Sequence, residues 1–236
     1  MALYRDQGIV LRTYKLGEAD RIVSFVTERH GKVRAVAKGV RKTKSKFGAR
    51  LEPTSHVALQ LYEGRELDIV TQAESIDNFR TIREDLDRLT RAVTMLEAAD
   101  QIALEREPNP DLYRMLLGAL RSLDHRNAEL VVAGFHWKLL SLEGFRPIVD
   151  HCALCQRADD LVAFDPTEGG LLCTDHRRGT RISPEAIQLL QAILGGRLAS
   201  ALDEPASSAT HEIDHLATRV MEHHLERRLR SVGLLE

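Results

Sequence analysis

Lys32-Val-Arg-Ala-Val-Ala-Lys38 carries a clear strand pattern in the first third of this chain. Val33, Ala35 and Ala37 occupy every second position, and Arg34 and Lys38 occupy positions of the opposite phase. Successive side chains of a β-strand point to opposite faces, so this pattern predicts a strand with one buried face. The basic side chains are then expected to project from the other face.

Four more short segments before residue 80 alternate apolar and polar residues in a similar way. They are residues 7–14, 21–27, 56–62 and 67–73. Turn segments at 28–31 and 63–66 each contain a glycine, which can adopt the positive φ of a tight turn. Five strands of this length predict a small β-barrel with basic groups on its outer surface.

After residue 80 the apolar residues recur with a helical period. The predicted first helix is long and buries one face: Ile82, Leu86, Leu89, Val93 and Leu96. Capping patterns predict further helices from Asn109-Pro110-Asp111, over residues 127–144, and from Ser183-Pro184-Glu185 to Gly195-Gly196.

A loop at 203–208 precedes a final amphipathic helix with an apolar face of Ile213, Leu216, Val220, Leu225 and Leu229. The sequence therefore predicts an α+β protein. We expect a barrel domain at residues 1–80 and a helical domain at residues 81–236.

Basic residues cluster in and after the third predicted strand. Residues 1–80 hold 15 Lys and Arg against 10 Asp and Glu, although the whole chain has a net charge of only −2. Between residues 32 and 50 there are eight basic residues and no acidic one: Lys32, Arg34, Lys38, Arg41, Lys42, Lys44, Lys46 and Arg50. Phosphate contacts release condensed counterions, so such a cluster suits a polyanion backbone. We expect these eight residues to bind nucleic acid, and a solvated charged loop is the alternative.

Three aromatic residues of the same region are candidates for stacking on bases. They are Tyr14, Phe47 and Tyr62. Stacking on an exposed ring stabilises single-stranded nucleic acid, but an aromatic residue of a small barrel is more often part of the core. Each of the three is therefore either a stacking platform or a core residue.

All three cysteines of the chain belong to one pattern. Cys152 and Cys155 form a Cys-x-x-Cys pair, 17 residues follow, and Cys173-Thr-Asp-His176 forms a second pair. This spacing is typical of a closed tetrahedral zinc site, with His176 as fourth ligand and His151 as a weaker candidate. Four protein ligands leave no position for a reactive water, so we expect a structural Zn²⁺ in a module at about residues 148–180.

Two other patterns suggest enzymes. His211-Glu212-Ile213-Asp214-His215 matches the His-Glu-x-x-His sequence of zinc metalloproteases, but a third ligand at a suitable position is missing. Gly39-Val-Arg-Lys-Thr-Lys44-Ser45 resembles a phosphate-binding loop but lacks the glycine before its lysine. We assign no catalytic residue and expect the protein not to be an enzyme, with the metalloprotease as the alternative.

The chain carries neither a signal-peptide pattern nor a hydrophobic run long enough to span a membrane. We therefore expect a cytoplasmic protein without a membrane partner. Thiols stay reduced in that compartment, which favours a metal site over disulfides.

Four segments together resemble the bacterial recombination mediator family RecO. They are Ala35–Ser45 (Ala-Val-Ala-Lys-Gly-Val-Arg-Lys-Thr-Lys-Ser), Glu63–Glu74 (Glu-Gly-Arg-Glu-Leu-Asp-Ile-Val-Thr-Gln-Ala-Glu), Gly144-Phe-Arg-Pro147, and Cys152 to Cys173 with Gly169-Gly-Leu-Leu172. They follow the order and separations of that family over nearly the whole chain. Its zinc ligands are usually four cysteines, so His176 stands here in place of the fourth.

The resemblance implies a fold and a function. The implied fold is an OB-fold barrel, a central helical bundle and an embedded zinc module. The implied function is non-catalytic: such proteins bind single- and double-stranded DNA, anneal complementary strands, and with RecR load RecA onto DNA coated by single-strand-binding protein. The implied partners also include the C-terminal tail of single-strand-binding protein, and the implied location is the cytoplasm at the nucleoid. An RNA-binding OB-fold factor is a further alternative.

Overall fold

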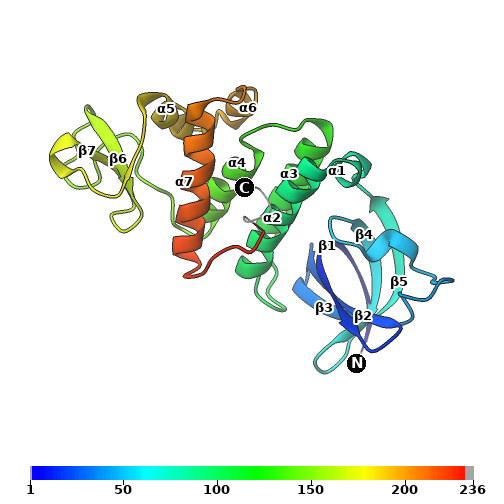
Figure 1. The fold of residues 1–236 in the computed structure, drawn as a ribbon. Helices are drawn as coiled ribbons and strands as arrows, with labels where there is room; N and C mark the ends of the chain where they lie inside the picture. The colour runs from blue at the N-terminus through cyan, green and yellow to red at the C-terminus, as the bar shows by residue number, and fades with distance from the viewer. Residues whose placement is uncertain (1, 232–236) are drawn as a thin grey trace. The chain divides into compact units, whose positions relative to one another are not determined.

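The computed structural model describes residues 2–231, and the chain divides after His125 into two compact units. Within these described residues, the first unit contains a barrel and three α-helices, and the second contains four α-helices and a small three-stranded sheet. Figure 1 shows the strands of the first unit in blue and cyan and the small sheet of the second in yellow-green.

The barrel consists of the five predicted strands: β1 (Leu3–Leu16), β2 (Asp20–Thr27), β3 (Gly31–Ala37), β4 (His56–Tyr62) and β5 (Asp68–Asp77). It closes in the order β1-β2-β3-β5-β4. All neighbouring strands are antiparallel except β3 and β5, which pair in parallel at Ala35 with Asp68 and at Val36 with Ile69. This is the OB-like barrel that we expected.

The alternation in β3 behaves as predicted. Val33, Ala35 and Ala37 are fully buried in the barrel core, and Arg34 and Val36 are partly exposed on the outside. The segment between β3 and β4 is also anchored in the core, because Phe47 and Leu51 are each only 1% exposed. A short 3₁₀ turn, Gly48–Leu51, joins these two anchors.

The predicted first helix is two helices, α1 (Arg80–Glu84) and α2 (Leu86–Ile102), so that expectation was wrong. Asp85 between them is extended, and its carboxylate accepts a hydrogen bond from Arg88 N, which starts α2 anew. The break changes the buried face: Leu86 is 80% exposed, while Thr94 and Met95 are fully buried.

The other helix of the first unit, α3 (Pro110–His125), begins as predicted. Asn109 caps it by accepting a hydrogen bond of 2.9 Å from Leu112 N. The helices α2 and α3 pack against each other and against β1, which is why the compact unit extends to His125. The chain changes from strands to helices near residue 80, where we expected a domain boundary. A boundary at that residue remains a proposal.

In the second unit, α4 (Val131–Leu142) packs against α7 (Ser208–His224) and α5 (Pro184–Leu194). α4 begins four residues later than predicted and ends next to Gly144, which has a φ of 86°. α5 begins after the Ser183 cap and ends at Gly195. The helix α6 (Leu198–Leu202) was not expected, and Leu225 and Leu229 lie beyond the end of α7.

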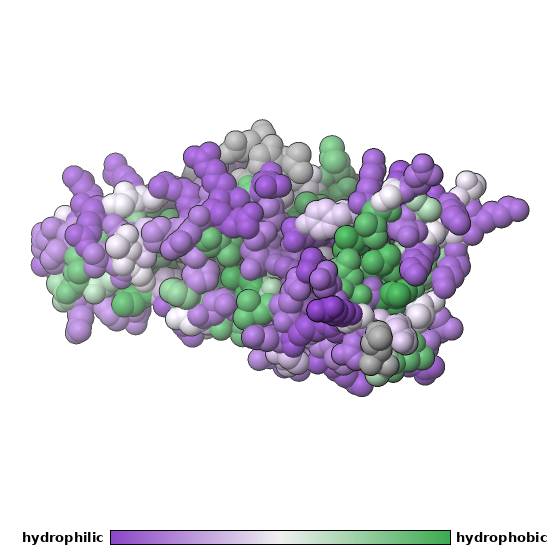
Figure 2. Space-filling model, turned by 90° about the horizontal axis from the view of Figure 1, so that it is seen from below, coloured by the Kyte–Doolittle hydropathy of each residue, from purple (hydrophilic) through white to green (hydrophobic). Residues whose placement is uncertain are grey.

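The small sheet consists of β6 (Leu161–Asp165), β7 (Gly170–Cys173) and β8 (Thr180–Arg181), in the order β7-β6-β8. It lies within the expected zinc module. Hydrophilic side chains cover much of the face shown in Figure 2, and a hydrophobic area interrupts them over the barrel. Among the helices of residues 2–231, none combines the length and apolar character needed to cross a membrane.

Candidate metal centre and nucleic-acid interface

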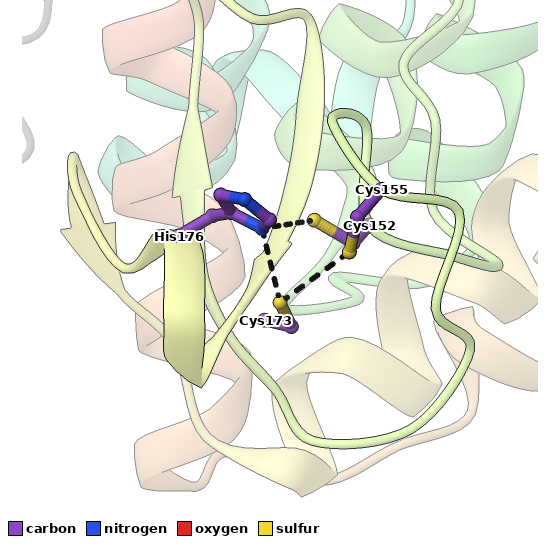
Figure 3. Close-up of side chains that lie close together, drawn as sticks. All are labelled: Cys152, Cys155, Cys173 and His176. Carbon is purple, nitrogen blue, oxygen red and sulfur yellow. Dashed lines mark hydrogen bonds between the residues drawn. The ribbon is translucent and has the colours of Figure 1, made fainter.

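Cys152, Cys155, Cys173 and His176 form one cluster, as the sequence spacing predicted (Figure 3). Cys152 and Cys155 come from a tight turn, Cys173 is the last residue of β7, and His176 ends the 3₁₀ turn Thr174–His176. The Nδ1 atom of His176 lies 3.7 Å from Cys152 Sγ and 3.4 Å from Cys173 Sγ. The sulfurs of Cys155 and Cys173 are 3.7 Å apart, and all four candidate ligand atoms lie within 4.8 Å of one another.

These separations fit a tetrahedral metal ion. With Zn–S of about 2.3 Å and Zn–N of about 2.0 to 2.1 Å, a tetrahedron requires about 3.8 Å between sulfurs and about 3.6 Å between sulfur and nitrogen. The three distances given above lie within about 0.2 Å of those values, and all four atoms lie within 4.8 Å of one another. The donor set of three thiols and one imidazole can therefore hold a metal ion.

Backbone hydrogen bonds bring the two ligand pairs together. Cys152 N donates to Arg157 O at 2.7 Å, and Gln156 N donates to Cys152 O at 2.9 Å, which closes the first turn. Ala153 N donates to Leu171 O at 2.8 Å and thereby attaches this turn to β7. The local apolar cluster is small: Cys152, Leu172 and Cys173, with Ala153 and Leu161 packed against it. Such a core buries little surface, so a bound metal would supply much of the module's stability.

The electrostatic environment favours the thiolate form of Cys152 and Cys173. At Cys155 a backbone hydrogen bond favours the thiolate too, but burial and the hydrogen bonds with Cys152 and Cys173 outweigh it and raise the pKa of the Cys155 thiol. Burial opposes ionisation of Cys152, but the backbone N–H groups of Cys173, Cys155 and Leu154 outweigh it and lower the pKa of this thiol to about 6. The hydrogen bond between Cys173 and His176 raises the pKa of the imidazole. The same hydrogen bond lowers the pKa of the Cys173 thiol against the effect of its burial. A deprotonated sulfur is the form that ligates a metal.

The two competing histidine candidates are placed elsewhere. His151 Nδ1 lies 2.8 Å from the carboxylate of Asp150 and does not belong to the cluster. In the His-Glu-x-x-His segment of α7, His211 and His215 are exposed, and Glu212 accepts a hydrogen bond of 2.8 Å from Ser183 N at the start of α5. Within residues 2–231, the Cys152–His176 cluster is the one group of three or more candidate ligands, so the geometry does not favour the protease.

The basic residues lie in two settings. Five are exposed in residues 39–55 before β4, a segment that we call the basic loop: Arg41, Lys42, Lys44, Lys46 and Arg50. Lys38, which directly follows β3, is exposed too. For the side chains of Lys38, Lys42 and Lys44, no hydrogen bond or ion pair exists within residues 2–231. Their charges are therefore available to a polyanion.

The remaining cations of the loop bind backbone oxygens. Arg41 donates to Glu18 O at 2.9 Å, Lys46 Nζ donates to Thr71 O at 2.9 Å, and Arg50 donates to Lys46 O at 2.9 Å. Carbonyl groups leave the positive charge of each side chain uncompensated. The bonds of Arg41 and Lys46 attach the basic loop to other segments of the barrel, and the bond of Arg50 lies within the loop.

The two residues inside β3 are engaged by acidic partners. Lys32 has an 11% exposed side chain and lies 2.9 Å from the carboxylate of Asp100 in α2. Arg34 pairs with Glu105 at 2.6 Å and keeps 40% of its side chain exposed. No local pattern indicates these two acids, because they follow their partners in β3 by about seventy residues. Asp100 reaches β3 from α2, and Glu105 reaches it from the segment after α2.

The three aromatic candidates for base stacking differ in solvent exposure. Phe47 is part of the barrel core and is not available for stacking. Tyr14 and Tyr62 are 44% and 39% exposed on the outer surface. Tyr14 has the guanidinium of Arg12 over its ring at 5.0 Å from the centroid. Arg12 was missed by sequence reasoning, although its alternation with Tyr14 in the predicted strand is a signal that could have found it.

Comparison with known proteins agrees with this architecture. A family model described as recombination protein O, N terminal, matches residues 1–79, and one described as recombination protein O, C terminal, matches residues 83–232. The chain belongs to the RecO family of DNA repair proteins. It is 44% identical over 244 residues to a DNA repair protein RecO from a Nocardioides species, with 99% of both chains covered. Residues 80–82, at the start of α1, separate the two segments matched by the RecO family models.

Proposed function

We propose that this chain is a non-catalytic recombination mediator that binds single- and double-stranded DNA through the basic loop. The observation that carries this proposal is the group of exposed cations Lys38, Lys42 and Lys44, which have no acidic partner within residues 2–231. Lys46, Arg41 and Arg50 add charge beside them. Lys32 and Arg34 would contribute less, because Asp100 and Glu105 already compensate them.

Phosphates carry no information about base identity, so this surface would bind DNA without sequence preference. A surface that neutralises two backbones at once and leaves base edges free would also promote annealing of complementary strands. Membership of the RecO family supports the remaining steps, in which the protein acts with RecR to load RecA onto DNA coated by single-strand-binding protein and contacts the C-terminal tail of that protein. Such a function would place it in the cytoplasm at the nucleoid.

The Cys152, Cys155, Cys173 and His176 cluster would hold a structural Zn²⁺. All four coordination positions would be filled by protein atoms, so the ion would cross-link the module and offer no site for a substrate. The same cluster would hold the module together in a protein without catalytic activity.

The basic loop is tested by the triple variant Lys42→Ala, Lys44→Ala, Lys46→Ala. Each phosphate contact adds about 0.7 to the slope of log K against log salt for single strands, so the triple variant is expected to lose about two units of slope. The matched control is Lys138→Ala, Arg197→Ala, Arg219→Ala, which removes the same charge from exposed positions of the second unit. An unaltered slope in the first variant, measured by titration at several salt concentrations, would refute the assignment.

The zinc site is tested by metal content. Cys155→Ser is expected to remove the ion and lower the midpoint of thermal unfolding, whereas His151→Ala and His215→Ala are expected to leave both unchanged. Loss of the metal in His215→Ala would instead support the protease alternative. A marked preference for RNA over DNA of the same sequence would favour the RNA-binding alternative.

A further inference from the structure

A row of apolar side chains crosses the outer face of the first three barrel strands. Tyr14 in β1 lies opposite Ile22 in β2, and Ile22 lies opposite Val36 in β3. Residues directly opposite each other in a sheet share a face. Their neighbours Val23 and Ala35 point into the core and are fully buried, so this row points outward. Tyr14 is 44% exposed, and Ile22 and Val36 are partly exposed.

Cationic side chains lie on both sides of this row. In the neighbouring row on the same face, Arg12 in β1 lies opposite Ser24 in β2, and Ser24 lies opposite Arg34 in β3. Two positions beyond Val36, the exposed Lys38 leads into the basic loop. The row therefore lies between positive groups that are spaced across the same face.

Arg12 is held in place by a buried acid. Its Nε atom lies 2.8 Å from the carboxylate of Asp100, and that carboxylate side chain is only 2% exposed. Lys32 Nζ lies 2.9 Å from the same carboxylate and also donates to Asp100 O at 2.6 Å. Two cations thus fix Asp100, and Asp100 fixes Arg12 with its guanidinium over the ring of Tyr14, 5.0 Å from the centroid. The planar group is oriented before any ligand arrives.

From this arrangement we propose a base-stacking site for single-stranded nucleic acid, formed by the Tyr14 ring and the Arg12 guanidinium, with Asp100 as the residue that positions Arg12. The inference rests on the proposed DNA-binding function and adds a strand specificity to it. Unpaired bases stack on aromatic rings and on guanidinium planes, and this stacking tolerates every base. The backbone of the same strand would reach Arg34 on one side and Lys38 on the other.

The proposed stacking site would bind single-stranded nucleic acid but not a duplex. In a duplex the bases stack on one another and are enclosed by the two backbones, so their faces cannot reach Tyr14. A duplex would bind through the basic loop alone, whereas a single strand would use the basic loop and the stacking site together.

The decisive variant is Tyr14→Ala, with Tyr62→Ala as its matched control. Tyr62 is a tyrosine of similar exposure on the same barrel, and within residues 2–231 no arginine lies over its ring. Affinities are measured for a single-stranded oligonucleotide and for a duplex of the same sequence, each at several salt concentrations. Tyr14→Ala is expected to weaken single-strand binding by roughly 5- to 150-fold, with duplex binding and both salt slopes unchanged, because a stacked base contributes without a phosphate contact.

Arg12→Lys tests the guanidinium plane while it keeps the positive charge. It is expected to weaken single-strand binding selectively, again without a change in salt slope. Asp100→Asn is expected to do the same if it folds, as checked by circular dichroism and thermal unfolding. Arg12→Lys remains informative if Asp100→Asn does not fold, because Arg12 has a 44% exposed side chain.

Three results would overturn the inference. The first is an unchanged affinity for the single strand in both Tyr14→Ala and Arg12→Lys. The second is an equal loss of affinity for single strand and duplex, and the third is an equal loss of single-strand affinity in Tyr62→Ala. Failure of the proposed function looks different: the unmodified protein would bind neither ligand at low salt.

Discussion

His136 in α4 is fully buried, and neither of its ring nitrogens has a hydrogen-bond partner within residues 2–231. Burial lowers the pKa of this imidazole to about 4, so the folded protein holds it in the neutral form. At the scale of single residues, an unpartnered polar group in an apolar core destabilises the fold and makes its stability depend on pH.

The expected pH dependence has a definite sign. Between the unfolded pKa of 6.5 and the folded pKa of about 4, the unfolded chain binds more protons, so stability is complete above pH 6.5 and falls as the pH decreases. Going from pH 7 to pH 5 should cost about 2 kcal/mol through this residue. In His136→Leu that part of the dependence is expected to disappear, as measured by urea unfolding at both pH values. His215→Leu on the exposed face of α7 is the control, and an equal pH dependence in His136→Leu and the unmodified protein would contradict the prediction.

Glu105 pairs with Arg34 and so limits how readily that guanidinium can bind a phosphate. Its carboxylate pairs with Arg34 at 2.6 Å, and both side chains are partly exposed, so a phosphate can compete for the guanidinium. Glu105→Gln is expected to raise DNA affinity by at most about fivefold, the size of an exposed ion pair. Fluorescence anisotropy with a labelled oligonucleotide measures this, and Glu74→Gln, an exposed acid of β5, is the control. A fall in affinity would show that Glu105 orders Arg34 for binding and does not compete for it.

At the scale of elements, the basic loop depends on its buried anchor. Phe47 and Leu51 insert into the barrel core, whereas Lys46 before Phe47 and Arg50 after it are exposed to solvent. This arrangement orders a segment whose charges repel one another. Phe47 is therefore a core residue, although basic residues surround it in the sequence.

Phe47→Ala is therefore expected to lower the free energy of unfolding by about 3 to 5 kcal/mol, the usual cost of truncating a buried phenylalanine. Chemical denaturation measures the effect. Phe145→Ala is the matched control, because Phe145 is 60% exposed and its removal should cost much less. If both variants were equally stable, Phe47 would not anchor the loop.

At the scale of the whole molecule, the candidate nucleic-acid interface and the candidate metal centre belong to different compact units. The barrel and α1 to α3 form the first unit, and the Cys152–His176 cluster belongs to the second. Because each unit has its own core, removal of the metal should act on one of them.

Chelation, or the Cys155→Ser substitution, is expected to lower the stability of the second unit and leave the barrel folded. Hydrogen exchange should show faster exchange at β6 and β7, with the amides of β2 and β3 unchanged. Parallel loss of protection in the barrel would mean that the protein unfolds as a single cooperative unit.

Sequence patterns predicted the elements whose signals are local. The alternation of Val33, Ala35 and Ala37 predicted β3 and the direction of its faces, and the Asn109 and Ser183 caps predicted the starts of α3 and α5. The spacing of Cys152, Cys155, Cys173 and His176 predicted a cluster that the structure brings together. The single helix expected over Ile82 to Leu96 was wrong. Asp85 is extended and caps α2, so the chain forms two helices despite the helical spacing of its apolar residues.

The barrel strands, the starts of α3 and α5, the candidate metal-ligand cluster and the sign of the charge on the basic loop follow from the sequence alone, because each depends on residues close together in the chain. Only the tertiary structure decided that Phe47 is core, that Asp100 and Glu105 compensate Lys32 and Arg34, and that Arg12 lies over Tyr14. Those contacts join β1, β3 and the segment around the end of α2, which are far apart in sequence. Whether a charge is free or paired is set by packing between such elements, and no local pattern of residue types encodes it.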